Sequence, residues 1–193
     1  MKGLPHAFPY VRINLMAGNE RYMEAKCGIG DISPSIRRDT AAHGQQPFAI
    51  IITCSDSRVI PEAIFSCGIG DLFVIRVAGN VIDNHQLGSV EYAADHLGAK
   101  LLVVMGHTHC GAVDAAINHD PAGYVRFLTD EIREAIGEET DPYKACCLNV
   151  RRSIFRIESS LTIQKDEEEG LAVIGAMYDI ETGKVDIIDG ESL

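Results

Sequence analysis

The sequence lacks the features that mark several classes of protein. No apolar run is long enough to span a bilayer, and the first 22 residues contain no apolar stretch of the length of a secretory signal. An excess of positive charge is also missing, because 28 acidic residues against 17 Lys and Arg give a formal net charge of −11. These absences predict a cytoplasmic protein that has neither a nucleic-acid nor a membrane partner.

The chain has no internal repeat and no low-complexity segment. Its 193 residues, 46% of them hydrophobic, are enough for one domain with a sizeable core. Six cysteines are scattered through the chain, at positions 27, 54, 67, 110, 146 and 147. In a reducing compartment this scatter favours free thiols or a metal site over a disulfide framework.

Strands and helices are predicted to alternate along the chain. Short apolar runs predict strands at 48–53, 72–79 and 100–106, and a closing strand pair at 171–180 and 184–189. Helices are expected at 61–68, at 89–98 with Ser89 as N-cap, and within 121–140. Asp141 and Pro142 begin a long helix whose apolar face includes Val150 and Leu161. The alternation predicts an α/β fold with a mainly parallel sheet flanked by helices on both faces.

The first 40 residues differ from the rest of the chain. The segment 10–40 is too polar to form a core of its own. We therefore expect an N-terminal helical arm at 1–40, followed by an α/β catalytic domain at 41–193, in a chain that is a single domain overall.

Two of the predicted strands end in a cysteine surrounded by polar residues. "CSDSR" at 54–58 follows the first strand, and "GHTHCG" at 106–111 follows the third. Parallel strands place their carboxyl ends at one edge of the sheet, so Cys54 can meet His107 and Cys110 there. Two thiolates and one imidazole are a suitable ligand set for Zn²⁺, and three protein ligands leave a fourth position open. His109 is the rival ligand, but it is adjacent to Cys110, and adjacent side chains rarely converge on one ion.

Asp56 and Arg58 supply the charged groups of "CSDSR". They are two residues apart, so a locally extended chain places both on one side. Arg58 can keep Asp56 ionised through a bidentate contact, and the carboxylate could then orient a metal-bound water. The alternative is an ion pair that only fixes a loop.

The remaining patterns are interpreted as structural. Cys146 and Cys147 are expected to pack inside the long helix. "CGIGD" at 67–71 lacks the third glycine and the preceding strand of a dinucleotide-binding motif, so it predicts a helix-to-strand turn. The acidic run at 166–170 is expected to be a solvated loop.

The paired motifs resemble those of the β-class carbonic anhydrases, which hold zinc with C-x-D-x-R and H-x-x-C. The likeness extends to "GQQPFA", "GDLFVIRVAGN" and "SVEYAADHLGAKLLVVMGH", and covers at least residues 44–114. It implies an α/β sheet of four or five strands, with a helical arm over a partner subunit. The implied activity is reversible hydration of CO₂ to bicarbonate and a proton, by attack of zinc-bound hydroxide.

The resemblance also assigns residues. It implies one Zn²⁺ per chain on Cys54, His107 and Cys110, with Asp56 and Arg58 as the catalytic dyad. The substrate pocket would be lined by Gln45, Phe73 and Tyr92, contributed across a dimer interface, and by the backbone N–H of Gly111. The implied assembly is a homodimer or a tetramer of dimers, with CO₂ and bicarbonate as the small-molecule partners.

The chain departs from the family pattern at two places. Thr108 and His109 replace the usual small pair inside H-x-x-C. Some bacterial members close the site at low pH, using a bicarbonate pocket that contains a tryptophan, an arginine and a tyrosine. Arg76 and Tyr178 are the counterparts of two of these, but the chain has no tryptophan, and Ile51 occupies that position. We therefore expect an open site near neutral pH, with Asp56 paired to Arg58 and non-cooperative inhibition by bicarbonate.

Three other functions share part of this pattern. Carbonyl sulfide and carbon disulfide hydrolases share the motifs, so the resemblance does not fix the substrate. A zinc-binding module or sensor without turnover would not need Asp56, Arg58 and the pocket residues. A cysteine phosphatase needs C-x₅-R, but Ile60 stands six residues after Cys54.

Overall fold

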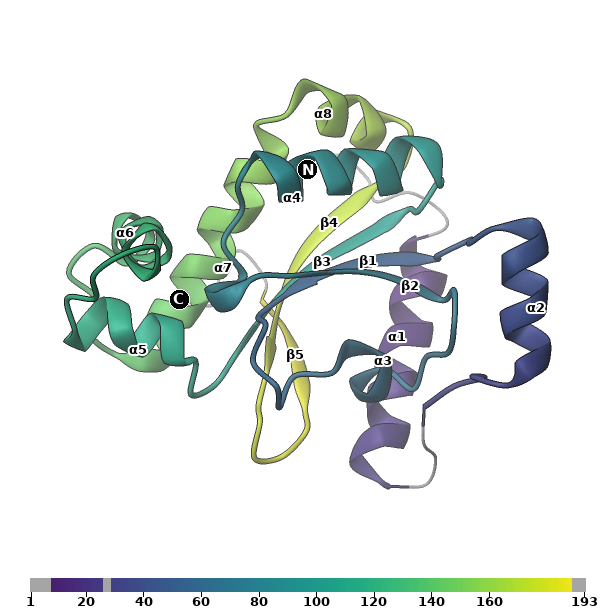
Figure 1. Ribbon diagram of the computed structural model, residues 1–193, viewed down its shortest axis with the longest axis horizontal. Coiled ribbons are helices and arrows are strands. Elements are labelled where there is room, and N and C mark those ends of the chain that lie inside the picture. Colours follow the sequence, from purple (N-terminus) through teal and green to yellow (C-terminus); the bar gives the residue numbers. More distant parts are fainter. Residues whose placement is uncertain (1–7, 26–28, 189–193) are drawn as a thin grey trace.

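The computed structural model of the chain describes residues 8–25 and 29–188. Within them lies one five-stranded sheet in the order β2-β1-β3-β4-β5. Strands β1 (Ala49–Thr53), β2 (Leu72–Arg76), β3 (Leu101–His107) and β4 (Ala172–Tyr178) are parallel, and β5 (Val185–Ile188) pairs antiparallel with β4. The mainly parallel α/β sheet predicted from the sequence is confirmed, and the closing pair is an antiparallel hairpin (Figure 1).

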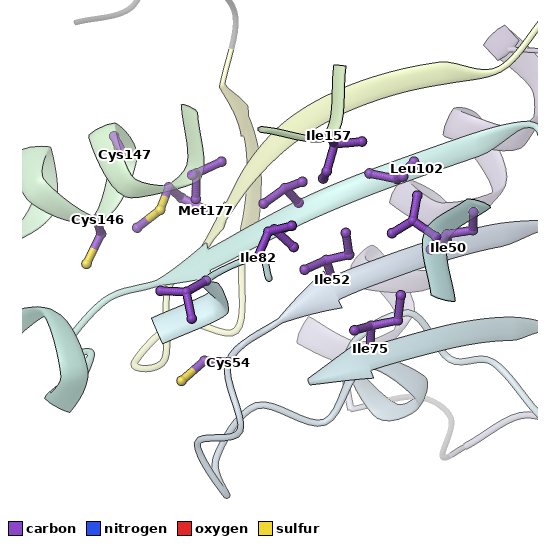
Figure 2. Close-up of a cluster of buried hydrophobic side chains, with 14 of the residues drawn as sticks. Ile50, Ile52, Cys54, Ile75, Ile82, Leu102, Cys146, Cys147, Ile157 and Met177 are labelled. Atoms are coloured by element: carbon purple, nitrogen blue, oxygen red, sulfur yellow. The ribbon is translucent and has the colours of Figure 1, made fainter. Parts of the chain in front are cut away.

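Helices cover both faces of the sheet, as the alternating core residues require. One core cluster contains Ile50, Ile52 and Leu102 (Figure 2), together with Val104. It is covered by α4 (Asn84–Glu91), the π-helical turn η2 (Tyr92–His96), α5 (Gly111–Asn118), α6 (Val125–Ile136), α7 (Pro142–Glu158) and α8 (Leu161–Glu168). The other contains Ile51, Val103 and Met105 and is covered by α1 (Phe8–Met23) and α3 (Pro61–Ile64). The first face thus carries most of the helical mass (Figure 1).

The two N-terminal helices differ in how they contact the rest of the chain. On α1, Leu15 and Asn19 are 3% and 1% exposed. The Asn19 side chain bonds to the carbonyl oxygens of Ile64 and Gly183 and to the Val185 N–H, at 3.3, 2.8 and 2.9 Å. Helix α2 (Pro34–His43) buries no residue and stands away from the sheet (Figure 1). The boundary at residue 40 stays a prediction, but α1 packs on its own chain.

Three local predictions were wrong. Helix α4 begins at Asn84, not at Ser89, because Asp83 and Gln86 form a reciprocal capping box. The long helix ends at Glu158, because Ser160 caps a new helix, α8, whose first residue, Leu161, is 82% exposed. The acidic run at 166–170 is not a solvated loop, since Asp166 lies within α8 and is 3% exposed.

The structural cysteines behave as the sequence predicts. Cys67, Cys146 and Cys147 are all buried free thiols. Burial raises the pKa of Cys67 to about 12, so that thiol stays neutral and unreactive. Cys27 lies outside the described residues. Among the described helices, none is both long and apolar enough to cross a bilayer.

Candidate metal centre

The predicted metal ligands come together at the carboxyl edge of the sheet. Cys54 follows the last residue of β1, His107 is the last residue of β3, and Cys110 is the N-cap of α5. Their ligating atoms all lie within 4.8 Å of one another, and all three residues are buried. No other group of three such side chains in the described part of the chain meets these conditions. Residues 53 apart in the sequence therefore meet because β1 and β3 are neighbours in the sheet.

The imidazole of His107 is oriented for binding an ion. Its Nδ1 lies 2.9 Å from the carbonyl oxygen of Thr108, to which it donates. This fixes Nε2 as the unprotonated nitrogen, and Nε2 is buried without a hydrogen-bond partner. A buried acceptor without a partner is costly, so the arrangement fits a metal ligand better than a core histidine.

His109 points away from this cluster. Its side chain is exposed, and its Nε2 lies 3.5 Å from the Glu181 carboxylate. The backbone of His109 has φ of +57°, which turns the chain tightly between His107 and Cys110. The geometry therefore favours His107 as the ligand, as the sequence predicts.

The two thiols interact strongly with each other. The hydrogen bond from Cys110 lowers the pKa of Cys54, against the effect of burial, and the Gly79 and Asp56 N–H groups lower it further. That same contact, together with burial, raises the pKa of Cys110. The cause is a proton that stays on Cys110 and is donated to the Cys54 thiolate, so that only one of the two sulfurs ionises readily; a divalent cation would stabilise both thiolates.

Backbone N–H groups also donate to Cys54, and no sequence pattern predicted these contacts. The Gly79 N–H donates to Cys54 Sγ at 3.2 Å, and the Asp56 N–H at 3.4 Å. Gly79 has φ of +70° in the short 3₁₀ turn η1 (Ala78–Asn80), and a Cβ there would lie 2.7 Å from Ile132 Cδ1. The signal that could have revealed this role is the glycine that ends the second predicted strand, 72–79.

Asp56 and Arg58 form the predicted bidentate pair. Arg58 Nε donates to Asp56 Oδ1 at 2.9 Å and Nη2 donates to Oδ2 at 2.7 Å, while the Arg58 N–H also donates to Oδ1. The side-chain bonds from Arg58 lower the pKa of Asp56 well below its usual range. Arg58 Nη2 also donates to the His109 carbonyl at 3.1 Å, so the pair connects both motifs.

The resemblance also assigns four residues to the substrate pocket, and in the structure they do not form one group around the metal ligands. Phe73 is half-buried and Tyr92 is 46% exposed, and their ring centroids are 6.2 Å apart. Gln45 is exposed between α2 and β1, and Gly111 is the exposed first residue of α5, next to Cys110. Phe73 pairs with Ile50, about 10 Å along the sheet from the carboxyl edge.

The counterparts of the bicarbonate pocket have other partners here. Arg76 donates to two backbone carbonyls, and the Tyr178 hydroxyl lies 3.1 Å from that of Tyr22. Ile51 is fully buried. The expectation of a site without this regulatory pocket stays a prediction.

Comparison with known proteins identifies the family. Residues 49–185 match the carbonic anhydrase family. Carbonic anhydrase 2 of Mycobacterium tuberculosis is 36% identical over 187 residues, which cover 91% of this chain and 90% of that protein. The carbonic anhydrase of Pseudomonas aeruginosa is 35% identical over 77% of this chain and 76% of its own length.

Solved structures also match carbonic anhydrases, and they identify the β-class within that family. A tetrameric β-carbonic anhydrase of Sordaria macrospora superposes with a TM-score of 0.71 at 27% identity, covering 94% of this chain and 95% of its own. The Coccomyxa β-carbonic anhydrase in complex with acetazolamide also has a TM-score of 0.71 at 27% identity, covering 94% and 86%. The chain belongs to the β-class carbonic anhydrases. Its activity is the zinc-dependent, reversible hydration of CO₂ to bicarbonate, and the hydrolase and sensor alternatives are not favoured.

Proposed function

We propose that this carbonic anhydrase binds one zinc ion on Cys54, His107 and Cys110. The observation that carries the proposal is the partnerless, buried Nε2 of His107, in a cluster whose ligating atoms all lie within 4.8 Å of one another. Thiolate and imidazole are preferred zinc ligands, and a three-ligand set is the catalytic rather than the structural pattern. Zinc bound there would lower the pKa of water and supply hydroxide near neutral pH.

Asp56 is proposed to orient the attacking water through one particular oxygen. Oδ1 already accepts two hydrogen bonds from Arg58, whereas Oδ2 accepts one. A carboxylate oxygen has two lone pairs, so Oδ2 keeps one free to accept a hydrogen bond from the nucleophile. Arg58 holds the carboxylate ionised and in a fixed position, which makes Asp56 an acceptor and a poor proton donor.

The N-terminus of α5 is proposed to stabilise the charge that develops on the substrate. Gly111 is the first residue of α5 and follows the ligand Cys110. The first N–H groups of a helix have no partner within the helix, and they attract negative charge. The Gly111 N–H can therefore donate to an oxygen of bicarbonate as it forms.

The remaining pocket residues are proposed to act across a subunit interface. On its own chain, Phe73 lies about 10 Å from the edge that carries the metal ligands. Tyr92, at 46% exposed, and the exposed Gln45 are available to a second copy. A homodimer or a tetramer of dimers follows, and the tetrameric state of the Sordaria relatives supports such an assembly.

One experiment tests the function directly. The purified protein should contain about one zinc per chain, and stopped-flow assays should show CO₂ hydration that disappears with a chelator and returns with Zn²⁺. Carbonyl sulfide and carbon disulfide serve as competing substrates in the same assay. Hydrolysis of either substrate without CO₂ hydration would contradict the proposal. A cytoplasmic location is part of the proposal, since the site requires reduced thiols.

A further inference from the structure

The turn η1 lies between the candidate metal centre and helix α7. On one side, its Gly79 N–H donates to Cys54 Sγ at 3.2 Å. Two consecutive residues of the turn, Gly79 and Asn80, have positive φ, at +70° and +46°. For a residue with a side chain, such as Asn80, this left-handed conformation is unfavourable and persists only where the surrounding structure holds it. The conformation that directs the Gly79 N–H at the sulfur therefore needs support from outside the turn.

Helix α7 supplies that support with two buried side chains. Asn149 Nδ2 donates to the Gly79 carbonyl at 2.6 Å, and Ser153 Oγ donates to the Asn80 carbonyl at 2.9 Å. Asn149 and Ser153 are four residues apart on α7, so they lie on one face of the helix. They are 2% and 3% exposed, so water does not compete for these bonds. Helix α7 thus fixes the two peptide units that follow the Gly79 N–H.

Helices α5 and α6 enclose the same turn. A Cβ at Gly79 would lie 2.7 Å from Ile132 Cδ1 on α6 and 3.1 Å from Ala112 Cβ on α5. Gly79 is itself buried, so its N–H cannot exchange the sulfur for water, and a buried N–H without any acceptor is costly. The contact between the Gly79 N–H and Cys54 is therefore a fixed part of the structure, and its geometry depends on how η1 is held.

We propose that Asn149 and Ser153 are positioning residues of the metal centre, which act on Cys54 through the Gly79 N–H. The inference rests on the proposed role of Cys54 as a zinc ligand. An N–H that donates to a ligating thiolate draws negative charge from the sulfur and fixes its direction, and such outer contacts tune how strongly the ligand binds its metal. Asn149 and Ser153 reach the sulfur only through the backbone of η1.

The cobalt-substituted protein reports on the sulfur directly, through the sulfur-to-cobalt charge-transfer absorption band. Asn149→Ala should move this band to longer wavelength, because a thiolate that loses a hydrogen bond gives up its electrons more easily. Ser153→Ala should move the band less, because its bond lies one peptide unit farther from the Gly79 N–H. The dissociation constant for zinc, measured by competition with a chelating dye, should rise about tenfold in Asn149→Ala.

Asn19→Ala is the matched control. Asn19 is 1% exposed, and its Nδ2 also donates to backbone carbonyl oxygens, but it lies on α1 at the other face of the sheet. This variant loses buried amide hydrogen bonds of the same kind without touching η1. It should melt at a lower temperature than wild type, yet keep the wild-type charge-transfer band and the wild-type dissociation constant for zinc when both are measured below the melting transition.

Three outcomes would overturn the inference. An unmoved band and an unchanged zinc constant in Asn149→Ala would mean that α7 only stabilises the fold. An equal shift in Asn19→Ala would mean that any loosening of the structure alters the site. Cobalt binding by the wild-type protein without a thiolate band would remove Cys54 from the ligand set, and the proposed function would then need another site, whereas the first two outcomes leave that function intact.

Discussion

Arg76 holds the main chain of Cys54. Its Nε donates to the Cys54 carbonyl at 3.1 Å, and its Nη2 donates to the Asp56 carbonyl at 2.7 Å. One guanidinium thus fixes the main chain of both a candidate zinc ligand and the aspartate of the dyad, from the neighbouring strand β2. It touches neither a ligand atom nor the carboxylate, so Arg76 is a positioning residue.

Arg76→Gln should therefore lower turnover without removing the metal. Loss of a supporting partner typically costs about 10- to 100-fold in activity, and we expect kcat to fall in that range with KM little changed. Arg76→Lys can restore only one of the two contacts and should recover part of the loss. Zinc content, kcat and KM are measured together. A pure loss of folded protein, with normal kcat per bound zinc, would contradict the positioning role.

Removal of a ligand should remove the ion. Cys54→Ala, His107→Ala and Cys110→Ala are expected to contain far less than one zinc per chain and to have negligible activity, because three protein ligands leave none to spare. His109→Ala, whose side chain faces Glu181, is the matched control and should keep its zinc. Elemental analysis after dialysis measures the zinc content per chain of each variant. Full zinc occupancy in His107→Ala would assign the ligand to His109 instead.

Asp56→Asn should lower the rate of CO₂ hydration without lowering the zinc content. The amide keeps the shape of the side chain but loses the charge that pairs with Arg58, and an Nδ2 group cannot accept a hydrogen bond from water. We expect normal zinc content and a kcat about 100-fold lower. Asp39→Asn, on the exposed surface of α2, should behave as wild type. Turnover at the wild-type rate in Asp56→Asn would remove the carboxylate from the mechanism.

Asn19→Ala should loosen α1 from the sheet. The substitution removes three hydrogen bonds and leaves the Gly183 carbonyl and the Val185 N–H without their partner, which costs about 2–4 kcal/mol. At one protein concentration, the melting temperature of the zinc-loaded protein should fall by roughly 5–15 °C. Asn14→Ala, on the exposed side of the same helix, should have little effect. Equal melting temperatures for both variants would mean that α1 does not depend on this anchor.

The active protein should sediment as a dimer or a larger assembly. Sedimentation velocity at micromolar concentration, with the CO₂ hydration assay run on the same sample, measures this. Gln45→Ala should reduce activity while the zinc content stays normal, because its side chain is proposed to complete a neighbouring site. A monomer with full activity would show that each chain completes its own site.

The main features of the fold and the ligand set could be predicted because they depend on local patterns. Apolar runs gave the strands, and parallel pairing then brought Cys54 to His107 and Cys110. The start of α4 was mispredicted because Ser89 and Asp83 are both good caps, and only the reciprocal bond with Gln86 decides between them. The pattern D-x-x-Q was present in the sequence and could have been used.

Other features depend on the path of the chain in three dimensions. The bond from the Gly79 N–H to Cys54 requires the left-handed backbone of η1, and the Arg76 contacts require the register between β1 and β2. Neither contact follows from a helical or strand periodicity that can be recognised in the sequence. The burial of Asp166 is similar, because an acidic run alone does not reveal that one of its members faces the core.

The division of the ligand set between two strands has a consequence for biosynthesis. Cys54 is made more than fifty residues before Cys110, and its co-ligands reach it only when β3 has paired beside β1. A nascent chain that stops before β3 can therefore hold no ion at this position, whatever the supply of zinc in the cell. Zinc binding is then a late step in the synthesis and folding of the protein, and it can occur only after β1 and β3 have paired at the centre of the sheet.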